Sequence, residues 1–198
     1  MRSLDYMNRV EAYVNRLNSE RRTVLETIPQ VRFLDLMADE INCADMTADC
    51  EEDENKKYGV APNLDAVHTR GYAKRSLVLE DCSSWPVFSC TDTWGGPDYH
   101  GIFAFSVTIT EEMKGRIIGF SLDTADDIWN TDNPQIMVYV NGVLTCAMDL
   151  NHHEVILSDC AEPGKIYDIR LYAYVNSPGK SNFLYLKVFA KEQEAEAL

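Results

Sequence analysis

The stretch that decides the fold is IMVYVNGVLTCA, residues 136–147. Two short apolar runs, Ile136 to Val140 and Val143 to Ala147, stand on either side of the pair Asn141-Gly142. Asn-Gly readily takes the positive φ angles that a type I′ turn requires. The segment therefore predicts a two-residue β-hairpin.

Alternation of apolar residues with a period of two predicts two further strand pairs. In the first, residues 103–109 alternate, and a turn over residues 111–115 leads into residues 117–122. In the second, residues 167–175 alternate and a Pro-Gly turn leads into residues 184–188. Each neighbouring pair of runs is expected to form an antiparallel hairpin.

Regularly spaced strands with tight turns and no helix between them are typical of a two-layer β-sandwich. The fold class is therefore predicted as mainly β, an antiparallel β-sandwich of the jelly-roll type over residues 81–190. Residues 191–198 are rich in Glu and Ala and are expected to begin a linker or a further domain.

The chain before the sandwich divides into two expected segments. Residues 1–30 carry apolar side chains at steps of three and four, which predicts an amphipathic N-terminal helix that ends before Pro29. Residues 31–80 include nine acidic residues between Asp35 and Glu54 and are expected to be irregular. A solvated loop is favoured there over an acidic binding motif.

Composition restricts the classes of partner. The 198 residues carry 18 Lys and Arg against 32 Asp and Glu, a formal net charge of −14. Nucleic acid and anionic membranes would be repelled by this charge, so neither is an expected partner. Without an apolar signal segment the chain is expected to be cytoplasmic, with its six cysteines as reduced thiols.

Three possible chemical signatures are weak. Pro178-Gly179-Lys180-Ser181 lies between two predicted strands and is interpreted as a turn rather than a phosphate loop. His152 and His153 are adjacent, so in a strand they point to opposite faces and are not expected to share a metal ion. The carboxylates of Asp123, Asp126, Asp127 and Asp132 lack an obvious means of raising one pKa, so catalysis by them is disfavoured.

Two loops combine aromatic and polar side chains in a way that suits sugar binding or a domain interface. The first, from Trp94 to His100, contains two glycines and contributes Trp94, Asp98, Tyr99 and His100 as candidates. The second, residues 129–134, contributes Trp129, Asn130 and Asp132. The alternative for Trp94 is a structural role in the core of the sandwich. Neither a catalytic nor a metal-binding residue is predicted in this chain.

Several of these stretches together resemble one known family. They are residues 84–88, residues 92–100, Asn133-Pro134-Gln135, residues 138–142 and residues 149–154. In order and spacing they resemble the N-terminal domain of bacterial glycoside hydrolase family 38 α-mannosidases. Residues 101–105 depart from the Trp-Phe-Arg-like run usual in that family.

The resemblance implies a galactose-binding-like sandwich that packs on a later catalytic domain of the same polypeptide. It also implies a parent enzyme that cleaves α-linked mannose with a zinc held by that later region, while this chain needs no cofactor. The expected role is thus a non-catalytic ancillary domain. Two alternatives are a carbohydrate-binding module for mannose-containing sugars and a free-standing non-catalytic paralogue. A homo-oligomer is also left open.

Overall fold

The computed structural model describes residues 22–37, 78–125 and 132–191. Ten strands make up most of this part of the chain, and a short 3₁₀ turn, η1 (Glu111–Met113), joins β4 to β5. The strands are β1 Arg22–Ile28, β2 Gln30–Asp35, β3 Val87–Ser89, β4 Tyr99–Thr108, β5 Ile117–Asp123, β6 Gln135–Val140, β7 Val143–Met148, β8 Glu154–Ser158, β9 Ile166–Val175 and β10 Tyr185–Lys191.

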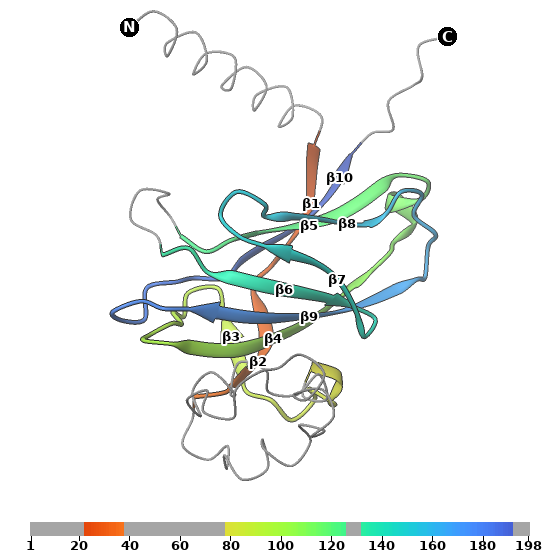
Figure 1. Cartoon of the computed structure of the whole chain (residues 1–198). Helices are drawn as coiled ribbons and strands as arrows, with labels where there is room; N and C mark the ends of the chain where they lie inside the picture. Colours follow the sequence, from red (N-terminus) through yellow and green to blue (C-terminus); the bar gives the residue numbers. More distant parts are fainter. Residues whose placement is uncertain (1–21, 38–77, 126–131, 192–198) are drawn as a thin grey trace, which may run out of the picture.

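The described strands form two antiparallel sheets that pack face to face (Figure 1). One sheet has the order β1-β10-β5-β8, and the other has the order β3-β2-β4-β9-β6-β7. The predicted mainly β fold, an antiparallel β-sandwich, is thereby confirmed. Pro29 is the single residue between β1 and β2, so the chain passes from one sheet to the other at this proline.

The main core lies between the sheets. Side chains that alternate along β4 and β9 face side chains that alternate along β5 and β10, since strand residues two apart share a face. The rings of Phe105 in β4 and Phe120 in β5 meet edge to face, with centroids 5.5 Å apart. Both side chains are buried, and they join the two sheets at the centre of the sandwich.

The hairpin predicted around Asn141-Gly142 is confirmed. β6 pairs with β7, and both turn residues have positive φ, 51° for Asn141 and 78° for Gly142. The other two predicted hairpins are wrong: β4 pairs with β9 and β2, whereas β5 pairs with β10 and β8. The alternating patterns mark buried faces, and these faces meet across the core instead of pairing edge to edge.

The N-terminal part of the described chain differs from the sequence expectation. Residues 1–21 of the predicted helix lie outside the described residues, but Arg22–Ile28 form strand β1 rather than the end of a helix. This segment is rich in β-branched residues, which favour strands, and it pairs along β10.

The segment expected to be irregular, residues 31–80, also contains regular structure. Gln30–Asp35 form β2, which lies between β3 and β4. Val31 is buried in the main core, and Phe33 stacks on Phe103 at a centroid distance of 4.6 Å. Residues 38–77 and the tail from 192 lie outside the described residues.

A second apolar cluster covers the outer face of the six-stranded sheet. Val78 and Trp85 pack there on Ile102, Ala104 and Tyr172. The segment that contains Val78 and Trp85 is attached to β2, because Arg32 Nη1 donates a hydrogen bond to the carbonyl oxygen of Trp85 at 2.9 Å. The six-stranded sheet is thus buried on both faces near its centre.

Substitution of Gly119 in β5 tests the close packing within the four-stranded sheet. A Cβ at this position would lie 2.5 Å from the Val155 carbonyl oxygen and 2.7 Å from Cζ of Phe189. We expect Gly119→Ala to lower the free energy of unfolding by about 1–3 kcal/mol, measured by urea denaturation, because the sheet must shift to accept a methyl group. Gly179→Ala is the control, since a Cβ there meets nothing within 4 Å. Equal stability of the two variants would contradict this packing.

Candidate functional site

Trp94 lies in the core. Its side chain is 1% exposed, and its ring packs on Phe103 with centroids 5.4 Å apart. The indole Nε1 donates a hydrogen bond to the carbonyl oxygen of Phe183 at 3.1 Å. A ligand cannot reach this ring in the described conformation, so the structure favours the core role over the sugar-binding role for Trp94.

The glycines after Trp94 let the chain turn away from the core. Gly95 and Gly96 have φ angles of 120° and 142°, which other residues rarely adopt. A Cβ on Gly95 would lie 3.0 Å from Nδ2 of Asn182. Trp94 and Asn182 exchange backbone hydrogen bonds of 2.9 and 3.1 Å, which join this loop to the β9–β10 connection.

The other candidates of this loop lie at the start of β4. The side chain of Tyr99 is buried, and this burial together with a hydrogen bond to Asp35 raises its pKa. His100, on the opposite face of the strand, is buried and hydrogen-bonded through Nδ1 to the Tyr172 hydroxyl at 2.8 Å. Asp98 has a positive φ of 49°, and its carboxylate lies 4.0 Å from Nε2 of His100. Tyr99 thus belongs to the main core, whereas His100 makes its polar contact with Tyr172 of the second apolar cluster.

The second candidate loop is only partly described. Trp129 and Asn130 lie outside the described residues, whereas the carboxylate of Asp132 accepts a hydrogen bond from the Ser181 hydroxyl. Because Asn182 pairs with Trp94, both candidate loops contact the β9–β10 connection. The structure therefore brings the two loops to the same end of the sandwich.

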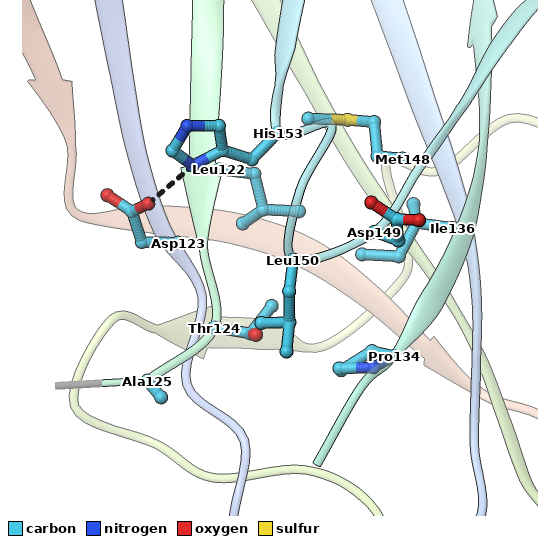
Figure 2. A pocket seen from close by; sticks show the side chains of 10 residues that line it. All are labelled: Leu122, Asp123, Thr124, Ala125, Pro134, Ile136, Met148, Asp149, Leu150 and His153. Atoms are coloured by element: carbon cyan, nitrogen blue, oxygen red, sulfur yellow. Dashed lines mark hydrogen bonds and ion pairs between the residues drawn. The ribbon is translucent and has the colours of Figure 1, made fainter. Parts of the chain in front are cut away.

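A pocket with a volume of about 90 Å³ opens at this end (Figure 2). Its walls come from the end of β5 and the residues after it, the start of β6, and the connection between β7 and β8. The lining residues are Leu122, Asp123, Thr124, Ala125, Pro134, Ile136, Met148, Asp149, Leu150 and His153. The pocket thus combines an apolar surface with two carboxylates, one imidazole and one hydroxyl.

Thr124 is the least usual residue of the pocket. Its side chain is 7% exposed, and its hydroxyl oxygen is buried without a hydrogen-bond partner. Its backbone is fixed, since its carbonyl oxygen accepts a hydrogen bond of 2.8 Å from the Phe183 amide. A buried hydroxyl without a partner costs free energy, so a ligand that hydrogen-bonds to it would gain from the contact.

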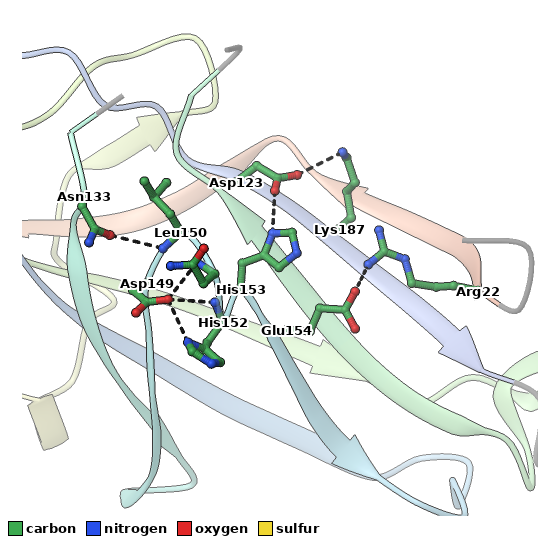
Figure 3. A network of polar contacts seen from close by, with 10 residues as sticks. Arg22, Asp123, Asn133, Asp149, Leu150, His152, His153, Glu154 and Lys187 are labelled. Atoms are coloured by element: carbon green, nitrogen blue, oxygen red, sulfur yellow. Dashed lines mark hydrogen bonds and ion pairs between the residues drawn. The ribbon is translucent and has the colours of Figure 1, made fainter. Parts of the chain in front are cut away.

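Asp149 shapes the β7–β8 connection. Its Oδ1 accepts hydrogen bonds from the amides of Asn151 and His152, both at 2.8 Å, and contacts Nδ1 of His152 at 3.0 Å (Figure 3). These bonds hold the pKa of the Asp149 carboxyl below its ordinary value. All three reach Oδ1, so Oδ2 is available to accept a hydrogen bond from a ligand.

Asp123 and His153 form the second polar wall. Nδ1 of His153 lies 2.9 Å from Oδ1 of Asp123, while Nζ of Lys187 lies 3.4 Å from Oδ2 (Figure 3). The hydrogen bond with His153 lowers the pKa of Asp123, and the same bond raises the pKa of His153. Asp123 therefore stays ionised, and the imidazole keeps its proton to a higher pH than a free histidine.

A neighbouring ion-pair network fixes the four-stranded sheet beside the pocket. Glu154 of β8 contacts Arg22 of β1, and its Oε2 accepts a hydrogen bond of 3.0 Å from Lys191 of β10. Burial alone would raise the pKa of Glu154, but Lys191 and Arg22 hold it below its ordinary value. The charged groups of Arg22 and Lys191 also lie over the buried ring of Phe189, 5.0 Å and 5.2 Å from its centroid respectively.

Sequence reasoning missed most of this pocket. It expected His152 and His153 to point to opposite faces of a strand, and their side chains contact different partners, Asp149 and Asp123. The run Asp149-Leu150-Asn151-His152 carries a usable signal, because an Asp that accepts amide bonds two and three residues later marks a fixed turn. Thr124 had no such signal, since only the fold leaves its hydroxyl without a partner.

Across residues 22–37, 78–125 and 132–191, no group of three His, Cys, Asp or Glu is placed to hold a metal ion. In the same ranges no helix is long and apolar enough to cross a membrane.

Comparisons with known proteins give no family. Neither a family model nor a curated protein matches the chain. Among solved structures, a β-glucuronidase from glycoside hydrolase family 2 is similar over 86% of this chain and 18% of its own, at 10% identity and a TM-score of 0.47. A Ruminococcus gnavus β-glucuronidase in complex with D-glucuronic acid is similar over 87% and 30%, at 11% identity and a TM-score of 0.44.

At these identities the likeness concerns the fold alone, and the chain spans less than a third of the length of these enzymes. The predicted relationship to family 38 α-mannosidases is wrong: the similar solved structures are β-glucuronidases, one of them from glycoside hydrolase family 2. A parent α-mannosidase and its zinc were predicted from that resemblance alone, so no observation now supports either prediction.

The Asp123–His153 pair predicts a pH dependence of stability. A raised His153 pKa means that the pair stabilises the fold fully below about pH 6.5 and less as the pH rises through the folded-state pKa. The lowered Asp123 pKa means that the stabilisation is present above about pH 4 and is lost in stronger acid. Both side chains are more than a third exposed, so the effect is about 1 kcal/mol or less.

The measurement is urea unfolding of wild type and His153→Gln at about pH 5.5 and about pH 8.5. We expect the variant to be less stable at the lower pH and close to wild type at the higher one. His152→Gln is the matched control, because its side chain is 78% exposed. A stability difference of the same size at both pH values would contradict the assignment.

Proposed function

We propose that this chain is a non-catalytic ancillary domain of a glycoside hydrolase and that it binds carbohydrate in the pocket at the end of the sandwich. The observation that carries the proposal is a pocket with an apolar wall, one of whose lining residues, Thr124, has a buried hydroxyl without a hydrogen-bond partner. Sugars present both hydroxyl groups and apolar C–H surfaces, so they match such a wall and such a hydroxyl.

The pocket chemistry suits a sugar ring held at its edge. Leu150, Met148 and Pro134 supply apolar contact, while Thr124 and Oδ2 of Asp149 can receive sugar hydroxyls. The volume of about 90 Å³ is well below the roughly 300–1,000 Å³ of pockets that enclose a whole small molecule. We therefore expect part of one sugar residue to enter, with weak, millimolar affinity.

The carboxylates near the pocket support a non-catalytic role. Glycoside hydrolysis requires one carboxylic acid whose pKa is raised, so that it can protonate the leaving group. Asp123, Asp149 and Glu154 instead have lowered pKa values, because each accepts hydrogen bonds from histidine, lysine, arginine or backbone amide groups. These groups act as acceptors and as structural ion pairs.

A second candidate function is docking onto a catalytic domain of the same polypeptide. It is favoured by β7, an edge strand of the six-stranded sheet, whose residues Val143 and Leu144 are 64% and 52% exposed. The strand VLTCAM contains no charge or proline, the devices that usually keep an edge strand from pairing. Leu79, also exposed, lies against the neighbouring Gly142 and extends the apolar surface. A cytoplasmic location and a homo-oligomer stay predictions from the sequence.

Thr124→Val tests the proposed binding role. Valine has nearly the same shape as threonine but cannot hydrogen-bond, so we expect sugar binding to weaken about three- to tenfold. The free protein should become more stable by about 1 kcal/mol, because the unpartnered hydroxyl is removed. The affinity for sugar is measured by NMR titration with methyl glycosides of neutral hexoses, and the stability of the free protein by urea unfolding.

Thr145→Val is the matched control, because Thr145 lies on the exposed face of β7 and bonds only to a local carbonyl. It should leave sugar binding unchanged. Binding by Thr124→Val at wild-type strength, or no binding by the wild type, would refute the proposed site. Hydrolysis of an aryl glycoside by the purified chain would refute the non-catalytic role.

A further inference from the structure

We propose that the pocket selects uncharged sugars and rejects uronic acids, an inference that rests on the proposed carbohydrate-binding function. The selection comes from the placement of two carboxylates on the pocket wall. Figure 2 shows Asp123 and Asp149 on opposite sides of the pocket, with His153 and Leu150 between them. A ligand carboxylate in this space would face a negative charge on either side.

The two carboxylates on the pocket wall differ in how far neighbouring groups compensate their negative charge. Both oxygens of Asp123 are engaged by cationic or hydrogen-bonding partners, Oδ1 by His153 and Oδ2 by Lys187. Asp149 contacts backbone amides and the exposed side chain of His152, so its negative charge is not paired with a lysine or arginine. Its Oδ2 is then a strong acceptor for a sugar hydroxyl and a repulsive neighbour for a sugar carboxylate.

Other titratable groups nearby reinforce this asymmetry. Glu154, next to His153, is already paired with Arg22 and Lys191, so those two cations are not available to an incoming anion. Lys187 is held by Asp123. Among the described residues that line the pocket, His153 is the side chain that can carry a positive charge. We therefore expect the discrimination against uronic acids to strengthen as the pH rises and His153 loses its proton.

The Thr124 hydroxyl supplies an independent reason for a neutral ligand. Thr124 lines the pocket, and its hydroxyl oxygen is buried and lacks a partner in the described structure. A hydroxyl can both donate to and accept from a sugar hydroxyl. Holding a carboxylate in a poorly solvated position would need a cation or several donors, which the lining side chains other than His153 do not provide.

The experiment compares matched pairs of methyl glycosides that differ only at C6. Methyl glucoside, galactoside and mannoside are titrated beside the corresponding methyl uronosides, at low salt and about pH 8, with dissociation constants from NMR shift changes. We expect at least one neutral sugar to bind, and its uronate to bind about fivefold more weakly or worse. Asp149→Asn should bring the members of a pair to within about twofold, because the amide keeps an acceptor oxygen without the charge.

Glu162→Gln is the matched control, since it removes one negative charge from an exposed position on the β8–β9 connection. It should leave the discrimination unchanged. Equal binding of neutral and acidic sugars by the wild type, or tighter binding of the acid, would overturn the selectivity while the carbohydrate-binding function stands. Absence of binding by every sugar in both series would overturn the function itself and the selectivity with it.

Discussion

Phe105 of β4 and Phe120 of β5 meet edge to face in the centre of the molecule, and the remaining structure depends on this contact between sheets. Several strands that are neighbours in sequence, such as β4 and β5 or β9 and β10, lie in opposite sheets, so their buried faces meet across the core. The connections between them must then cross the ends of the sandwich. Trp94 is buried at one end, and its bonds to Asn182 and Phe183 fix the β9–β10 connection, whose Phe183 amide in turn bonds to the carbonyl oxygen of Thr124 in the pocket wall.

The pocket is a consequence of that closed end. Leu122 and Ile136 belong to the core and also line the pocket, so its floor is as rigid as the sandwich. Asp149 and Asn133 hold the rim in place through backbone amides of the β7–β8 connection. A rigid site keeps its polar groups oriented before a ligand arrives, which reduces the entropy lost on binding. Weak binding of one sugar edge is consistent with a pocket that is small but preorganised.

The sequence predicted the fold class because alternation and turn chemistry are local properties. Asn141-Gly142 determines its own turn, and the buried faces of β4 and β9 follow from spacing alone. Strand pairing was predicted less well, because alternation does not say whether the next strand lies beside a strand or across the core from it. The β-branched residues of Arg22–Ile28 favour a strand, but no local pattern shows that β10 is its partner.

The candidate site was harder to predict for a related reason. Trp94, Tyr99 and His100 looked like ligand-binding residues in sequence, yet their side chains are buried and make internal contacts. Thr124, Asp149 and His153 meet only after β5, β6 and β8 are in place. The most direct test is an NMR experiment on the protein with labelled methyl groups in the presence of a neutral methyl hexoside. Intermolecular nuclear Overhauser effects from the methyl groups of Thr124, Met148 and Leu150 to the sugar are predicted. Effects confined to Val143 and Leu144, or none at all, would contradict a sugar site at this end of the sandwich.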